Sequence, residues 1–260
     1  MMTNEIKKNT DRMLVSLSFD GDGSSFIESL VKLASILNAE LCGLFTEDSE
    51  LQQIANLPFS REITFPTAHT RELNSEQITR HLKQHAETLR KIMQEFSQLA
   101  NVACSFRTAK GSRIETALSE SYDFQIVVLL PEKYSSLKPG QHARLDELIN
   151  PAVMLYDGSK QAQKSAYIVK LLAGKGDLHE LKVLTLSHDC EALIKEQLSI
   201  DKIKIDCQHI DSYNISNIVS LLRTQKTGLV ILPLEDELIN QSREIREMLN
   251  ALKCPLLLIR

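Results

Sequence analysis

Two short acidic turns that contain glycine are the residues of this chain best placed to do chemistry. The first, at residues 20–24 (DGDGS), follows the apolar residues 13–18, and the second, at residues 157–159 (DGS), follows the apolar residues 153–156. Each turn leads into a segment with a helical pattern of apolar residues, so the sequence predicts strand, acidic turn and helix twice. Parallel α/β sheets bind ligands beyond the carboxyl ends of such strands, which makes these turns the predicted ligand-binding positions.

The recurrence of this pattern over a domain-sized distance predicts an internal duplication. A chain of 260 residues has room for two domains of ordinary size. We therefore predict a first domain over residues 1–150, with an N-terminal tail at 1–11, and a second over residues 151–260.

Strand-like and helix-like segments alternate along both predicted domains. This alternation predicts an α/β fold of two Rossmann-like domains, each with a parallel, doubly wound sheet. The expected strands are residues 13–18, 39–45, 102–107, 124–130, 152–156, 181–186, 203–210, 229–232 and 256–259. The expected helices are residues 24–37, 47–56, 75–99, 113–118, 141–149, 160–172, 190–198, 215–224 and 240–252, with an irregular stretch at 57–74.

The segment at residues 151–156 has two readings. Its spacing suits a fifth strand of the first domain, whereas its trailing DGS turn suits strand one of the second, and we favour the second reading. The first sheet then lacks one edge strand. Because an open edge invites pairing, we expect the other domain or another subunit to cover it.

Composition excludes several classes of function. The net charge of −4 and the absence of Trp disfavour nucleic-acid binding, which needs a basic face and stacking side chains. No apolar run approaches the length of a transmembrane helix, and residues 1–12 are too polar for a signal peptide. Five scattered cysteines indicate free thiols in a reducing compartment, so the predicted location is cytoplasmic.

Further short motifs complete a recognisable order. Residues 41–48 (LCGLFTED) resemble a strand and its exit, residues 110–112 (KGS) open a helix, and residues 252–260 (LKCPLLLIR) resemble a terminal strand. Together with the two acidic turns, they make the chain resemble the universal stress protein family in its tandem form. The resemblance implies adenine-nucleotide-alpha-hydrolase-like domains and makes ATP or AMP the expected ligand of a nucleotide-binding member. The residues at the corresponding positions here are Asp20, Gly21, Gly140, Asp157, Gly158 and Ser159.

The glycine-rich signature that nucleotide-binding members carry after strand four is missing from both domains. Pro131 and Pro233 stand where its first glycine belongs, and proline has no N–H to donate to a phosphate. Residues 235–237 (EDE) add negative charge in the second domain, and only Gly140 and Ser242 remain of the signature. We therefore predict a non-catalytic stress-response or regulatory module without a cofactor, which works through a protein partner, a homodimer or a different small ligand.

Three alternatives stay open. The first domain could still act as an AMP or ATP sensor through Asp20 and the region of Gly140, although such an aspartate more commonly caps a helix or shapes a turn. A metal-dependent hydrolase would need zinc between residues 188–190 (HDC) and 207–209 (CQH), a spacing that fits no common zinc motif. His81 and His85 share a helix face but lack the glutamate of a metalloprotease helix. The sequence contains no motif for a catalytic mechanism.

Overall fold

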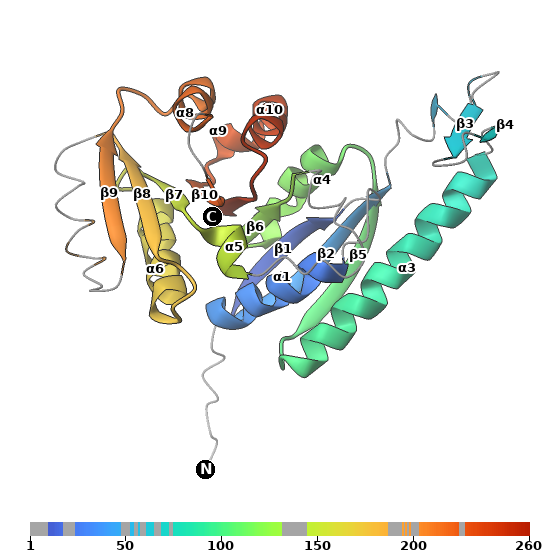
Figure 1. Ribbon diagram of the computed structural model, residues 1–260, viewed down its shortest axis with the longest axis horizontal. Coiled ribbons are helices and arrows are strands. Elements are labelled where there is room, and N and C mark those ends of the chain that lie inside the picture. The colour runs from blue at the N-terminus through green and yellow to red at the C-terminus, as the bar shows by residue number, and fades with distance from the viewer. Residues whose placement is uncertain are drawn as a thin grey trace, which may run out of the picture.

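A single nine-stranded sheet organises the computed structural model of the chain, with helices on both faces (Figure 1). The strand order is β5-β2-β1-β6-β11-β10-β7-β8-β9. These strands are β1 (Asp11–Leu17), β2 (Ala39–Glu47), β5 (Cys104–Lys110), β6 (Ile126–Leu129), β7 (Ala152–Tyr156), β8 (Glu180–Thr185), β9 (Lys204–His209), β10 (Leu229–Pro233) and β11 (Leu256–Ile259). The structure describes residues 10–17, 24–47, 53, 54, 57, 61–64, 69–72, 75–131, 145–186, 194, 196, 198, 203–223 and 227–260.

Two layers of helices cover the sheet. One face carries α1 (Ser24–Leu37), α3 (Ser75–Leu99), α5 (Leu145–Ile149) and α6 (Lys160–Gly174). The other carries α4 (Arg113–Glu120), α8 (Ile215–Leu222) and α10 (Ser242–Leu252), with the short α9 (Asp236–Ile239) nearby (Figure 1). Successive strand residues serve opposite cores: in β1, Met13 and Val15 pack on the α1 side, whereas Leu14 packs on the α4 side.

All neighbouring strands of the sheet are parallel except β6 and β11. These two strands pair antiparallel, with Ile126 opposite Ile259 and Leu129 opposite Leu256, and their eight residues are buried. We call this pairing the seam. Strand direction reverses at the seam. The carboxyl ends of β5, β2, β1 and β6 therefore lie at one edge of the sheet, and those of the other five strands lie at the opposite edge.

The strand pairings answer two questions that the sequence left: which strands residues 152–156 join, and what covers the open edge of the first four strands. β7 pairs with β8 and β10, so residues 152–156 belong with the later strands, as we favoured. β11 covers the open side of β6, so the chain itself closes the edge that residues 1–150 leave incomplete. The expectation of two sheets is corrected to one continuous sheet, because this edge pairing joins the two strand sets.

The structure adds short elements that the sequence did not predict. β3 (Arg61–Thr64) and β4 (His69–Glu72) form an antiparallel hairpin within the stretch we expected to be irregular, at the N-terminal end of α3 (Figure 1). Four-residue strands are too short to give a convincing alternation. The single turn of α9 is likewise too short for a periodic signal. In the described part of the chain, no helix has the length and apolar character needed to cross a membrane.

Contacts at the base of β7 hold neighbouring turns together. The Asn150 side chain donates to the carbonyl oxygens of Asp146 (2.9 Å) and Asp177 (2.6 Å) and accepts from the N–H of His179 (2.8 Å). Gly228 packs on the backbone of this same residue, where an added Cβ would lie 2.5 Å from the Asn150 carbonyl oxygen. Only glycine fits at position 228, because backbone atoms cannot rotate aside as a side chain can.

We expect Gly228→Ala to lower the free energy of unfolding by about 1–3 kcal/mol through this overpacking. Gly174→Ala is the matched control, since a Cβ there meets no atom within 4 Å and alanine is the better helix former. Urea denaturation of both variants measures the difference. Equal midpoints for the two variants would contradict the close contact at Asn150.

We also expect Leu258→Ala, in the centre of the seam, to lower stability by about 2–5 kcal/mol, because Leu258 is fully buried. Hydrogen exchange should speed up in both β2 and β8, since the seam joins the strand sets that contain them. Leu186→Ala, at a site 39% exposed, is the control and should have little effect. Loss of protection on one side alone would show that the two strand sets unfold independently.

Candidate functional site

The turn after β7 is the one predicted site that the structure describes completely. Asp157 accepts a hydrogen bond from the N–H of Ser159 (2.8 Å), and Gly158 takes a positive φ of 83°. The Ser159 side chain in turn accepts from the N–H of Ala162 (3.1 Å) and thereby caps α6. These are the contacts of an aspartate turn followed by an N-cap.

Each side chain of this turn therefore has a structural task without any ligand. The bond from Asp157 to Ser159 sets the turn, and glycine supplies the left-handed backbone conformation that the turn needs. A nucleotide contact by Asp157, Gly158 or Ser159 stays a prediction. The other predicted contacts, Asp20, Gly21 and Gly140, lie outside the described residues.

The residues that follow β10 offer few N–H donors for a phosphate. Pro233 is the last residue of β10 and has no N–H. The N–H of Leu234 donates to the carbonyl oxygen of Ile259 (2.6 Å), and the Leu234 side chain is 1% exposed. Asp236 and Glu237 follow in the first turn of α9, where Arg260 binds the Asp236 carboxylate at 3.0 Å. This set of groups does not fit a polyphosphate.

The exit of β6 is described only as far as Pro131, which is buried. The carbonyl oxygen of Leu130 accepts a hydrogen bond from the Arg113 side chain (2.7 Å), which comes from the start of α4. Ser112, at the N-cap of α4, makes no side-chain cap and instead accepts from Arg246 of α10 (2.7 Å). These contacts pack α4 against β6 and α10.

The zinc alternative gains no support from the residues that can be placed. Cys207 lies in β9, is partly buried, and packs on the core that α6 covers. His209 is exposed at the end of the same strand, while residues 188–190 are outside the described part of the chain. Among the residues that the structure describes, no three side chains of His, Cys, Asp or Glu form a group that could hold a metal ion.

The histidines of α3 and the described cysteines show no arrangement that indicates catalysis. His81 is exposed on α3, whereas His85 packs against Phe45 with 5.9 Å between ring centroids. Burial raises the pKa of the Cys104 thiol, which disfavours the reactive thiolate. The described cysteines Cys42, Cys104, Cys207 and Cys254 form no disulfide, as the sequence predicted for these four.

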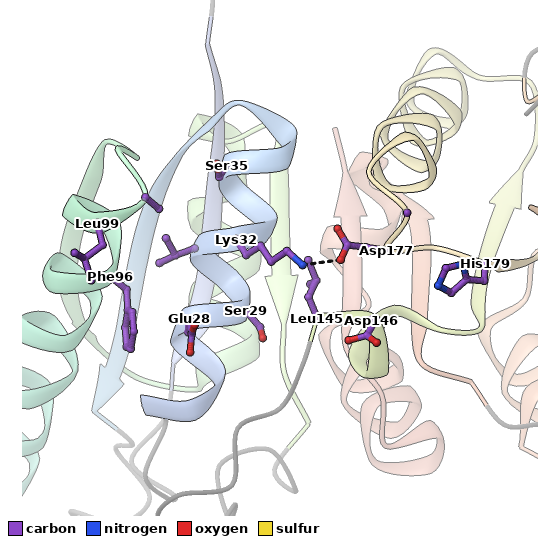
Figure 2. Close-up of a pocket in the computed structure, with 13 residues that line it drawn as sticks. Glu28, Ser29, Lys32, Ser35, Phe96, Leu99, Leu145, Asp146, Asp177 and His179 are labelled. Atoms are coloured by element: carbon purple, nitrogen blue, oxygen red, sulfur yellow. Dashed lines mark hydrogen bonds and ion pairs between the residues drawn. The ribbon is translucent and has the colours of Figure 1, made fainter. Parts of the chain in front are cut away.

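A groove crosses the outer side of α1 (Figure 2). It has a volume of about 730 Å³. Its walls are the C-terminal end of α3, the start of α5 and the turn after α6. The residues that line it are Glu28, Ser29, Val31, Lys32, Ser35, Phe96, Leu99, Ala100, Leu145, Asp146, Gly176, Asp177 and His179. The groove could not be foreseen from the sequence, because its lining comes from four separate segments, residues 28–35, 96–100, 145–146 and 176–179, and no motif links them.

A second hollow of about 460 Å³ lies between the end of β9 and α8. Its lining includes His209, Asp211 and Ser220, and it shares no residue with the turn at 157–159. Neither hollow includes a residue of the predicted nucleotide contacts, whereas the second includes Gln208 and His209 of the zinc alternative.

Comparisons with known proteins do not identify the chain: no protein-family model matches it, and no curated protein gives a significant match. The likeness to universal stress proteins therefore rests on the motifs themselves.

We expect Ser159→Ala to lower the free energy of unfolding by about 1 kcal/mol, because it removes the N-cap of α6. Ser112→Ala is the matched comparison, since Ser112 stands at an N-cap without capping its helix. Urea denaturation should show the larger loss for Ser159→Ala. A larger loss at Ser112 would mean that its contact with Arg246 outweighs the cap.

Proposed function

We propose that the chain is a tandem member of the universal stress protein family that has lost ATP binding and works as a non-catalytic stress-response or regulatory module. In this proposal residues 1–150 and 151–260 are duplicated domains fused through the seam. The order of strands supports it: β5-β2-β1-β6 in the first part corresponds to β9-β8-β7-β10 in the second, each in chain order three, two, one, four. The repeated acidic turns of the sequence fall after corresponding strands, β1 and β7.

The exit of β10 carries the proposal. A phosphate-binding loop needs successive N–H groups that point at the ligand. Here Pro233 has no N–H, and the N–H of Leu234 already donates to the carbonyl oxygen of Ile259 at 2.6 Å. Because the Leu234 side chain is also buried, the loop cannot turn its amide outward without exposing a core residue.

The charged residues after β10 also disfavour a polyphosphate. Asp236 and Glu237 stand in the first turn of α9, and their carboxylates would repel a polyphosphate at close range. Arg260 contacts this turn, and its guanidinium already pairs with Asp236. A member that lost this loop in both domains would act through protein contacts or a different small ligand.

The first domain decides between this function and its main alternative. Pro131 removes one donor at the exit of β6, as Pro233 does at β10. A sensor of AMP or ATP would have to use Asp20, Gly21 and Gly140 of this domain alone.

Analysis of the freshly purified protein tests the proposal. We expect mass spectrometry of the supernatant after heat denaturation to find no adenine nucleotide, and added ATP or AMP to leave the melting temperature unchanged. A ligand that binds the folded state must raise that temperature, by an amount that grows with its concentration. A nucleotide present in proportion to the protein would overturn the proposal and establish the sensor.

Two variants, one in each domain, assign the binding site if nucleotide is found. Gly140→Pro removes a predicted donor in the first domain, and Gly158→Ala strains the turn of the second, where φ is 83°. Loss of nucleotide in Gly140→Pro alone would assign binding to the first domain. Loss in Gly158→Ala alone would contradict the reading of the β10 exit as closed.

A further inference from the structure

β9 is the outermost strand at one end of the nine-stranded sheet, beside β8 (Figure 1). Among the described strands only β8 pairs with it, in parallel and with Glu180 opposite Lys204. The strand contains no proline, so each of its residues has an N–H. A strand at the end of a sheet presents backbone groups to which a further strand can bind.

The hydrogen bonds to β8 show which backbone groups of β9 face outward. The N–H of Lys204 donates to the carbonyl oxygen of His179 (2.9 Å), and the N–H of Ile210 donates to that of Thr185 (2.9 Å). The N–H and C=O of one strand residue point to the same side, and successive residues alternate, so the even-numbered residues of β9 face β8. The N–H and C=O of Ile205 therefore point away from the sheet.

The side chains of β9 divide between an apolar and a charged face. Ile203 and Ile205 pack on the core that α6 covers. Lys204 and Asp206 alternate with them and are exposed on the opposite face. The Lys204 ammonium lies 3.6 Å from the Glu180 carboxylate of β8, and both side chains are more than half exposed. The Asp206 carboxylate makes no ion pair with the described residues.

One antiparallel register of β9 on a second β9 places opposite charges opposite each other. Residues whose backbone groups point outward must face each other in such a pair, so a two-fold axis passes through a residue. With the axis at Ile205, Lys204 of each copy lies opposite Asp206 of the other. An axis at Lys204 or at Asp206 sets like charges opposite each other, which is destabilising. An axis at Cys207 or Gln208 sets neither charge opposite its counterpart.

The other end of the sheet lacks this self-complementarity. β5 is outermost there, and it carries Arg107 and Lys110 but no acidic residue. No register of β5 on a second β5 can therefore pair opposite charges. Basic side chains on an edge strand disfavour edge-to-edge pairing. Of the two ends, the one at β9 suits a second copy of the chain.

We propose that two copies of the chain pair through β9, antiparallel about a two-fold axis at Ile205, so that their sheets become continuous. The interface is isologous, because each copy contributes one Lys204 and one Asp206. Opposed residues of this non-hydrogen-bonded type have Cα atoms about 4.5 Å apart, close enough for their side chains to form an ion pair. On the other face the two Ile205 side chains meet. The inference names one protein contact of the proposed module and does not depend on the loss of ATP binding.

Sedimentation velocity of the full chain over a range of concentrations tests the pairing. We expect a dimer, which Lys204→Glu and Asp206→Lys should each weaken by at least about fivefold, because each sets like charges opposite each other. The double variant exchanges the two charges and should restore the dimer. A double variant that dimerises as weakly as the single ones would overturn the proposal. So would a wild-type chain that stays monomeric, or one that forms assemblies larger than a dimer.

A backbone variant tests the strand pairing itself. Ile205→Pro removes an N–H that points away from β8, so it should abolish the dimer without removing a hydrogen bond of the sheet. Thr108→Pro is the matched control on β5: the N–H of Gly111 donates to Glu47 of β2, so by alternation that of Thr108 points outward. A dimer that Thr108→Pro dissociates and Ile205→Pro does not would place the interface at β5 and refute the proposal. If Ile205→Pro does not fold, the charge exchange still decides.

The two proposals can fail separately. A monomeric protein would leave the proposed loss of ATP binding intact, because that rests on the β10 exit. A nucleotide found on the purified protein would refute the loss of ATP binding without bearing on β9.

Discussion

The antiparallel pairing of β6 with β11 is the interaction on which the rest of this structure depends. Without β11, β6 would be the open edge of four parallel strands, and without β6, β11 would be the open edge of five. Both strands are buried on both faces, so their separation would expose apolar side chains as well as backbone groups. Helices on either side also meet across the seam: α1 packs on α6, and α4 packs on α10. Two incomplete layers thus become one continuous core on each face.

The reversal at the seam also decides where functional surfaces can form. Because of this reversal, the carboxyl end of β1 and the carboxyl end of β7 lie at opposite edges of the sheet. The groove across α1 arises differently, from the approach of α1 to α5 and to the turn after α6. Lys32 with Asp177 (2.6 Å) joins α1 to the turn after α6, and Lys164 with Asp11 (2.9 Å) joins α6 to β1. Such partly exposed ion pairs contribute little stability, and their main effect is on the relative placement of the helices.

Most of the fold could be predicted from local pattern, because strands buried on both faces and amphipathic helices each leave a clear periodicity. The long helix at residues 75–99 and the strands at 152–156 and 256–259 match the prediction residue for residue. The sequence indicated that the first sheet has an open edge that must be covered. It did not indicate which segment covers it, because nothing in residues 126–129 specifies β11. The candidate site was harder still. The function of Asp157 depends on which groups surround it, and the groove depends on side chains from four separate segments.

Pro233 and the residue after it attach the exit of β10 to the core of the fold. Once Pro233 removes one N–H, the next amide, that of Leu234, is free to bind the end of β11, and its bond to Ile259 fixes the chain against the seam. Burial of the Leu234 side chain then makes the change hard to reverse, since reopening the loop would cost both the hydrogen bond and the apolar contact. Pro233 and Leu234 thus hold the end of β10 against β11, and the Leu234 amide serves this pairing.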